Sequence, residues 1–324
     1  MLGFRMSLSS VASRRRPIWG LRDYDVPGQI GLEEDIDIYV ARLVDVFKEV
    51  WRVIRDDGTL WLNLGDRYSS AGKSERDFDP KLPKRSGRHR GLVTAKNGIK
   101  QKELIGIPWK VAFALQEDGW YLRSDIIWAK PNPMPESIRD RPTKSHEYLF
   151  LLSKKKQYYY DNEAIKEDCV SGSRGSRFDT GKTAKNGLGR VSTKERVDNV
   201  RRNKRDVWTV ATQCFKGAHF ATFPPELIRP CILAGCPQGG VVLDPFSGAG
   251  TTGLVAMQEG RRSILIELKP EYVEVAKKRC GGIRPEKPVI IGGDFNGNGA
   301  DQRSFGRCFR AGIESESRKR AKRT

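Results

Sequence analysis

The first hydrophobic pattern along the chain has the spacing of a helix. Ile36–Val53 carries apolar residues that fall on one helical face, and the acidic segment Glu33–Asp35 precedes it. Negative charge is favourable at the N-terminus of a helix. The short apolar run Thr59–Leu64 follows turn residues and ends at Gly65, so it predicts a buried strand.

The middle of the chain predicts one more helix and two more strands. The helix covers Pro108–Glu117, and the strands Trp120–Ala129 and Glu147–Ser153 flank a proline-rich segment. We expect Gln157–Asp161 to continue the pairing of the second strand.

Two polar stretches interrupt this pattern. Residues 68–102 are polar and basic, which is typical of a surface loop. Residues 168–203 are rich in Gly, Ser, Arg and Lys and have almost no apolar periodicity. We expect the second stretch to be an insertion that becomes ordered when a partner binds.

The last patterned block alternates helices with strands. It consists of a helix from Pro225 to Ala234, strand Gly240–Asp244, helix Thr252–Glu259, strand Ser263–Glu267 and helix Glu271–Arg279. A strand, a helix and a strand in succession favour parallel pairing. We therefore predict an α/β fold with a mostly parallel sheet, followed after Gly281 by a tail without pattern.

The composition also indicates a class of binding partner. The chain has 324 residues, with 59 Lys and Arg against 40 Asp and Glu, which gives a net charge of +19. Such a charge indicates a polyanionic partner, and nucleic acid is the first candidate. The alternative, charge held in solvated ends, explains part of the excess, because Arg14–Arg16 and Arg318–Arg323 lie near the ends. The remaining body is still basic.

Cysteine, histidine and apolar content argue against several other classes. The 6 cysteines form no Cys-x-x-Cys pair and the chain has 3 histidines, so we expect neither a zinc site nor a disulfide framework. The apolar runs are far shorter than the roughly 20 residues of a membrane span, and no secretory leader opens the chain. We expect a cytoplasmic protein with no metal and no membrane partner.

The sharpest motif is VVLDPFSGAGTT, residues 241–252. A hydrophobic strand brings Asp244 to its carboxyl end, and a tight turn with Gly248 and Gly250 leads into a helix. Ligands of open α/β sheets bind outside the carboxyl ends of the strands. The run is not Gly-x-Gly-x-x-Gly and has no phosphate-loop lysine, so it disfavours phosphate recognition.

A second acid, Glu267, ends the next predicted strand. An acid at this position commonly receives ribose hydroxyls. An acid before the turn and another after the second strand suit a nucleoside that also carries a cationic amino acid, such as S-adenosylmethionine. The alternative is an ordinary strand–turn–helix unit with an unrelated acid.

These motifs are similar to a known family. DPFSGAGTTG together with HFATFPPELIRP (His219–Pro230) resembles the cofactor half of the DNA amino-methyltransferases, in the permuted class whose catalytic motif comes first. Further segments in the same order support the resemblance over Pro17–Lys278: Trp19–Tyr24, Gly28–Glu33, Leu60–Tyr68, Trp128–Glu136 and Lys144–Lys154.

The resemblance implies a Rossmann-like fold that uses S-adenosylmethionine. It places the catalytic half at 17–160, a target-recognition insertion at 161–207 and the cofactor half at 208–280. Residues 1–16 would be an aberrant or disordered N-terminus, and residues 281–324 a basic disordered tail.

The resemblance also implies a cofactor-binding set: Asp244, Phe246, Gly248, Gly250, Thr251, Thr252, Glu267 and Phe223. Asp244 would meet the methionine amino group, directly or through water, and Glu267 would hold the ribose. Thr251 and Thr252 would cap the following helix and reach the cofactor carboxylate. Phe223 would line the adenine pocket, although a core position is the alternative for it, as it is for Phe246.

The catalytic motif departs from the family. The family has Ser or Asp, Pro, Pro and an aromatic residue, which accept hydrogen bonds from the target amine and stack on a flipped base. The matching register here is Arg15-Arg16-Pro17-Ile18, followed by Trp19, so the implied catalytic residues are Pro17, Ile18 and Trp19. Arg15 can only donate hydrogen bonds. The alternative function is therefore a catalytically impaired homologue that binds cofactor and DNA.

The residues before this motif also lack the apolar strand that the family has there. One choice of codons for Ser13–Arg16, read in another frame, spells Thr-Ser-Pro-Pro. A single net inserted base before Pro17 would account for both departures, and sequencing the gene tests this hypothesis. A Ser-Pro-Pro motif would favour cytosine N4 over adenine N6 as the target.

Basic residues outside the cofactor motif predict contacts to duplex DNA. They are Arg139, Arg141 and Lys144 after the proline-rich segment, and Arg202 and Arg205 before Trp208. A solvated face is the alternative for each of them singly. His146 beside Glu147 is expected to be a structural pair at a strand end, with catalysis as the alternative. RNA or a small molecule is the alternative acceptor, and we expect a monomer or homodimer.

Overall fold

The computed structural model describes residues 28–69, 98–168, 201–213 and 223–281, and the backbone of two strands at 7–11 and 289–292. The expected catalytic residues Pro17, Ile18 and Trp19 lie outside the described residues. Most of the two polar stretches, residues 70–97 and 169–200, lie outside them as well.

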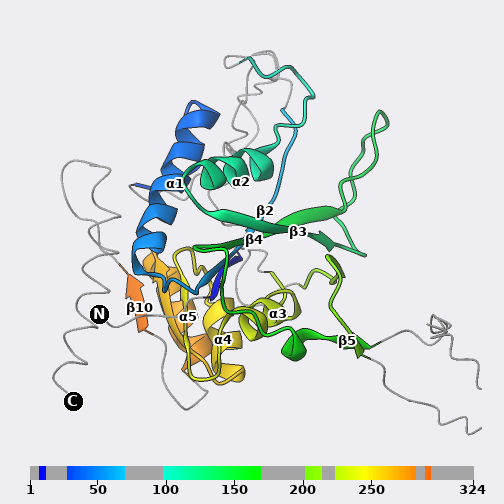
Figure 1. Ribbon diagram of the computed structural model, residues 1–324. Coiled ribbons are helices and arrows are strands. Elements are labelled where there is room, and N and C mark those ends of the chain that lie inside the picture. Colours follow the sequence, from blue (N-terminus) through cyan, green and yellow to red (C-terminus); the bar gives the residue numbers. More distant parts are fainter. Residues whose placement is uncertain are drawn as a thin grey trace, which may run out of the picture.

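One sheet has five strands in the order β1-β2-β4-β3-β7 (Figure 1). Their bounds are β1 Ser7–Val11, β2 Thr59–Leu64, β3 Tyr121–Ala129, β4 His146–Ser153 and β7 Val207–Thr209. The pairs β1/β2 and β3/β7 are parallel, whereas β4 is antiparallel to both β2 and β3. The sheet is therefore mixed, because β4 runs against both of its neighbours.

The second sheet is parallel throughout, in the order β10-β9-β8. Its strands are β8 Val241–Asp244, β9 Arg262–Glu267 and β10 Val289–Gly292. β1 lies beside β8, so the two sheets adjoin. A separate short pair, β5 Glu167–Asp168 with β6 Arg201–Arg202, is antiparallel.

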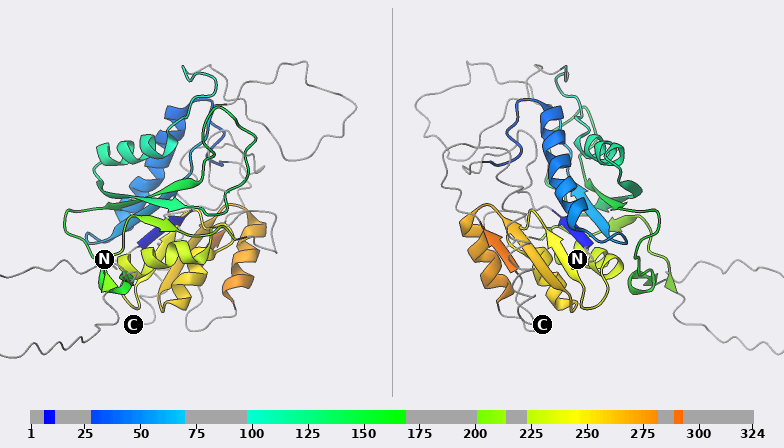
Figure 2. Two further views of the ribbon diagram at one scale, coloured as in Figure 1. Left: turned by 90° about the vertical axis from the view of Figure 1, so that its right-hand side faces the viewer. Right: turned by 60° about the vertical axis from the view of Figure 1, so that its left-hand side comes forward.

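Helices cover both faces of these strands (Figures 1 and 2). They are α1 Ile36–Val53, α2 Ile107–Glu117, α3 Pro225–Gly235, α4 Thr251–Gln258 and α5 Pro270–Cys280, with a short 3-10 helix at Glu163–Ile165. Successive side chains of a strand point to opposite faces. In β2, Leu60 and Leu62 pack with α1 and α2, whereas Trp61 packs with α3 and α4.

The same alternation continues across the junction between the sheets. In β8, Val241 and Leu243 join the α1 and α2 side, and Val242 joins the α3 and α4 side. The two sheets therefore act as one surface between two helical layers. No helix within the described ranges is both long and apolar enough to cross a membrane.

The structure differs from the sequence pattern in three segments. The backbone of Ser7–Val11 forms a strand although the stretch is not apolar, because strand pairing uses backbone groups. β10 follows Gly281, where the sequence pattern is lost. Gln157–Asp161 does not extend β4; instead the Tyr159 amide donates to the Asp57 carbonyl.

Candidate cofactor turn and catalytic edge

Asp244 ends β8 and ties three parts of the motif together. Its side chain is buried, and one carboxylate oxygen accepts from the Phe246 amide at 3.0 Å. The other accepts from the Thr252 hydroxyl at 2.5 Å. The carboxylate therefore links the strand end, the turn and the first residues of α4.

Glu267 ends β9 and holds the same turn from the other side. One carboxylate oxygen accepts from the Gly248 amide at 2.8 Å, and the other from the Lys269 amide at 3.0 Å. Glu267 is half-buried, whereas Asp244 is fully buried. The structure thus brings together both acids and the glycine turn between them.

The turn requires glycine at its last position. Gly250 has φ +77° and is the N-cap of α4, and a Cβ there would lie 2.9 Å from the Cβ of Ala276 on α5. Glycine adopts positive φ without strain and permits this close approach. Gly248 also has a positive φ, of 51°.

The expected capping role of Thr251 and Thr252 is wrong. The N-cap of α4 is Gly250, and no side chain caps the helix. The Thr252 hydroxyl instead donates to Asp244, and the Thr251 hydroxyl accepts from Arg279 of α5 at 2.7 Å. Burial lowers the pKa of the Arg279 guanidinium. The sequence pattern does not indicate Arg279, because only the packing of α5 against the turn brings its guanidinium to Thr251.

The two aromatic residues of the predicted set lie in different surroundings. Phe223 is buried in the apolar cluster that contains Trp61 and Leu227. Phe246 is half-buried, and its ring meets the edge of Phe47 on α1 with centroids 6.5 Å apart. Phe223 thus lies within one apolar cluster, and Phe246 lies at the margin of the other.

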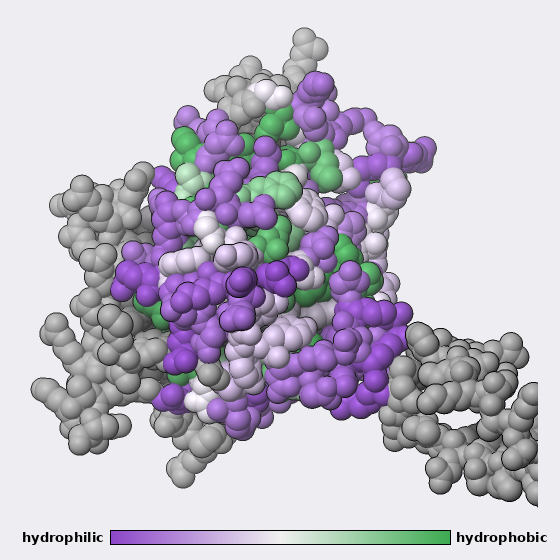
Figure 3. Space-filling view, in the orientation of Figure 1, coloured by the Kyte–Doolittle hydropathy of each residue, from purple (hydrophilic) through white to green (hydrophobic). Residues whose placement is uncertain are grey.

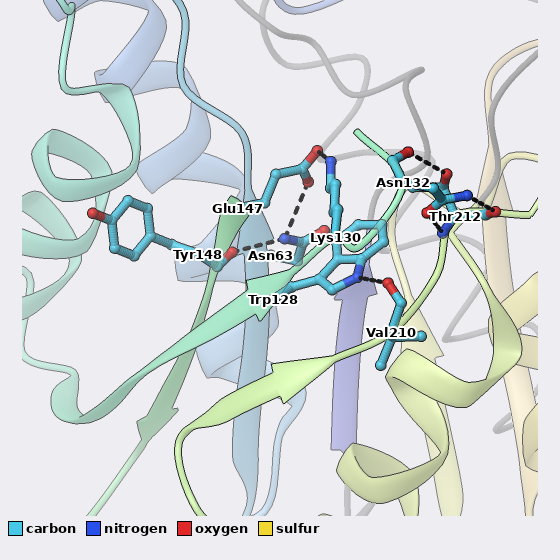
Figure 4. Close-up of polar contacts among 8 residues, drawn as sticks. All are labelled: Asn63, Trp128, Lys130, Asn132, Glu147, Tyr148, Val210 and Thr212. Carbon is cyan, nitrogen blue, oxygen red and sulfur yellow. Dashed lines mark hydrogen bonds and ion pairs between the residues drawn. The ribbon is translucent and has the colours of Figure 1, made fainter. Parts of the chain in front are cut away.

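A second group of polar residues lies where β2 and β3 end and β4 begins (Figure 4). The buried Asn63 amide of β2 donates to the Tyr148 carbonyl at 2.7 Å and to the Glu147 carboxylate at 3.3 Å. Glu147 also forms an ion pair with Lys130. The Lys130 ammonium lies 4.4 Å from the ring centroid of Trp128. Sequence analysis named Glu147 but missed Asn63 and Lys130, although an Asn within an apolar strand is an available signal.

The surroundings of Glu147 are dominated by cations. Burial lowers the pKa of His146, and the charges of Lys144 and Lys130 lower it further, so His146 is neutral at pH 7. Burial also lowers the pKa of Lys144. The rings of His146 and Tyr148 pack edge to face, with centroids 5.4 Å apart.

Most of the expected DNA-binding cations have local partners. Arg141 donates to Glu136 at 2.8 Å and lies 3.6 Å from the ring centroid of Tyr68. Arg202 and Arg205 both bond Glu167, each at 2.9 Å. Arg139 is exposed, and Lys144 is half-buried. Figure 3 shows that the face of the molecule seen in Figure 1 is mostly hydrophilic, with apolar residues among the polar ones.

The fold and the turn define a class: an α/β domain with a glycine turn that two carboxylates hold at the ends of adjacent parallel strands. The sequence narrows this class, because the chain belongs to the N6/N4 DNA methylase family, whose profile matches residues 15–278. The chain is a DNA methyltransferase, and S-adenosylmethionine is its methyl donor.

Named relatives support the assignment. The chain is 52% identical over 266 residues to the type II methyltransferase M.Cfr9I of Citrobacter freundii, covering 82% of this chain and 79% of the relative. It is 49% identical to M.SmaI of Serratia marcescens, covering 81% of each. The PvuII DNA methyltransferase structure, described as cytosine-N4-specific, has the same fold with a TM-score of 0.52. That likeness covers 86% of this chain and 78% of the other at 17% identity.

The residues of the turn fit the methyl donor. Carboxylate oxygens are acceptors for ribose hydroxyls and for an ammonium group, and Glu267 is half-buried at the strand end where such acceptors are needed. Asp244 is fully buried, and its carboxylate accepts hydrogen bonds from the turn and from the first residues of α4. No group of metal-ligating side chains occurs among the residues that the structure describes.

Proposed function

We propose that this chain transfers the methyl group of S-adenosylmethionine to the exocyclic amino group of cytosine (N4) or adenine (N6) in duplex DNA. The observation that carries the proposal is the turn at residues 246–248, which Asp244 and Glu267 hold from two adjacent parallel strands. This half of the domain, residues 208–280, binds the donor, and residues 17–160 receive the target base.

Each residue of the turn has a distinct role in this proposal. Glu267 accepts hydrogen bonds from the ribose hydroxyls, and Gly248 lets the backbone approach the nucleoside. Asp244 orients the turn through Phe246 and Thr252, so it reaches the methionine amino group through water. When bound, the donor supplies an electrophilic methyl group on a sulfonium sulfur.

DNA binding follows from charge. The net charge of +19 favours a polyanion, and Arg139 offers an exposed cation beside the β3–β4 segment. Lys144, Arg141, Arg202 and Arg205 contribute to the positive field while they hold their local partners. We propose duplex DNA as the substrate, a monomer or homodimer as the active species, and the bacterial cytoplasm as its compartment.

The decisive experiment is calorimetry with S-adenosylmethionine on the parent chain and Glu267→Gln. A hydrogen bond to a charged group contributes about 1.5–3 kcal/mol, so the variant should bind at least about tenfold more weakly. Glu274→Gln is the matched control, because Glu274 lies exposed on α5 and pairs only locally with Lys277 in the same helix. If Glu267→Gln and the parent bind the donor with equal affinity, Glu267 does not contribute to donor binding.

A second candidate function rests on Arg15-Arg16-Pro17-Ile18, which has no acceptor at its first position. In that case the chain binds donor and DNA without transferring the methyl group. Tritium transfer from labelled donor to unmethylated plasmid DNA separates the two functions. Mass spectrometry of the methylated nucleosides then identifies N4-methylcytosine or N6-methyladenine.

A further inference from the structure

The polar group at the ends of β2, β3 and β4 is built around a buried amide. Asn63 is fully buried, and its amide donates to the Tyr148 carbonyl and to Glu147. A buried amide costs free energy unless it is hydrogen-bonded. These two bonds therefore fix Asn63, and Asn63 in turn orients the Glu147 carboxylate.

Lys130 holds the same carboxylate from the end of β3. The Lys130 and Glu147 side chains are 17% and 22% exposed, so water reaches both. A partly buried ion pair is weak evidence for stability, because desolvation offsets most of its attraction. Another ion-pair group, Asp56 with Lys154 and Lys155, already connects the opposite ends of β2 and β4. Stability alone thus gives little reason for the Lys130–Glu147 pair.

The position of the pair relates it to the reaction. The register of β1 against β2 pairs Val11 with Asn63, so the carboxyl end of β1 lies beside this group. β1 also lies beside β8, the strand that leads into the cofactor turn. At Gly65, an added Cβ would be 3.5 Å from the Glu147 carboxyl carbon, so the backbone of Gly65 lies next to this carboxylate.

We propose that Glu147 accepts a hydrogen bond from the exocyclic amine of the target base, with Asn63 and Lys130 as positioning residues. The inference rests on the proposed function and gives this chain an amine acceptor that does not depend on position 15. The amine nitrogen attacks the donor methyl, so an N–C bond forms while the C–S bond breaks and its electrons stay on sulfur. The nitrogen then gives a proton to the Glu147 carboxylate, which releases it to water.

The charged neighbours make Glu147 the suitable acceptor of this group. Among the residues that the structure describes, the titratable groups near it include Lys130, Lys144, His146 and Asp66. Asp66 uses its carboxylate to bond the first amides of α2. Lys130 and Lys144 are cationic, and His146 is neutral at pH 7 for the reasons given above. A general acid–base group contributes about 10²–10⁴-fold to rate.

The test compares Glu147→Gln with the parent chain in tritium transfer to unmethylated plasmid DNA and in calorimetry with S-adenosylmethionine. The variant should lower kcat by about 100-fold or more, while its affinity for the donor stays within about twofold. Asp56→Asn is the matched control, because it removes a carboxylate at the opposite end of the same strand pair, and it should leave kcat within about twofold.

One result overturns the inference while the proposed function stands: the parent chain transfers the methyl group to DNA, and the kcat of Glu147→Gln lies within about threefold of the parent. A parent that does not bind the donor, or that binds it without methyl transfer, contradicts the proposed function itself. If Glu147→Gln does not fold, Glu147→Asp decides: its shorter side chain draws the carboxylate back and should lower kcat by about tenfold, whereas parental kcat counts against Glu147.

Discussion

Gly250 shows how one residue connects local backbone geometry to the packing of two helices. Its positive φ starts α4, and the absence of a side chain lets α5 approach through Ala276. Gly253 contributes in the same way, since an added Cβ there would lie 2.6 Å from Leu265. The sequence pattern predicted glycines in a turn, but the helix contact behind the turn follows only from the packing.

Gly250→Ala is expected to destabilise the protein by two effects. A side chain in the left-handed region costs about 1–2 kcal/mol, and the contact with Ala276 adds to this cost. Gly239→Ala is the matched control, because Gly239 has φ +70° but nothing within 4 Å of its added Cβ. Urea unfolding should give a larger loss for Gly250→Ala, by about 1 kcal/mol or more. Equal losses in the free energy of unfolding would mean that the contact with α5 adds nothing to the cost of Gly250→Ala.

At the scale of elements, helix α2 depends on a side chain that another element provides. Its N-cap, Gly106, provides no side chain, and the cap comes from Asp66 after β2. The Asp66 carboxylate accepts from the Gly106 amide at 3.1 Å and from the Ile107 amide at 3.2 Å. A cap supplied from 40 residues away has no local signature in the sequence.

Asp66→Ala is expected to lower the free energy of unfolding by about 1–2 kcal/mol, the usual cost of losing an N-cap carboxylate. Asp140→Ala serves as the comparison, because Asp140 forms an exposed ion pair with Lys102. Exposed pairs contribute about 0–1 kcal/mol. Denaturant midpoints measure both, and an Asp66→Ala variant as stable as Asp140→Ala would show that α2 needs no such cap.

Most elements were predictable because their side-chain patterns are strong. Ile36–Val53 and Thr59–Leu64 form a helix and a strand with the predicted bounds, and the other patterned elements differ by about one residue at their ends. β10 was not predicted because it lies beyond the alternating helices and strands, after Gly281, and β1 because it is polar. Both strands are held by backbone pairing to a neighbouring strand. The direction of β4 depends on its two neighbours, which its own sequence does not specify.

At the scale of the whole molecule, two sheets and two helical layers form one domain whose charge is strongly positive. Several cations that looked available in the sequence are paired in the structure, for example Arg202 and Arg205 with Glu167. Their contribution to DNA binding is therefore a long-range field as much as direct contact. Fields of this kind are screened by salt.

DNA affinity is accordingly expected to fall steeply with salt. Six phosphate contacts would weaken binding by about 10³-fold between 50 and 200 mM salt. Fluorescence anisotropy with a duplex oligonucleotide measures the slope of log affinity against log salt concentration. A flat dependence would contradict binding through the phosphate backbone, and the same titration on single-stranded RNA compares the other acceptor class.

The sequence by itself determined the helices and strands with strong periodicity, the turn with its two acids, and the family. These features depend on neighbouring residues and on motifs that are continuous in the chain. Tertiary structure decided the reversal of β4, the enclosure of Asp244, the local pairing of the arginines and the contact of Asn63 and Lys130 with Glu147. The contact of Asn63 with Glu147 joins residues 84 positions apart, and only the packing of the sheet brings such distant side chains within hydrogen-bonding distance.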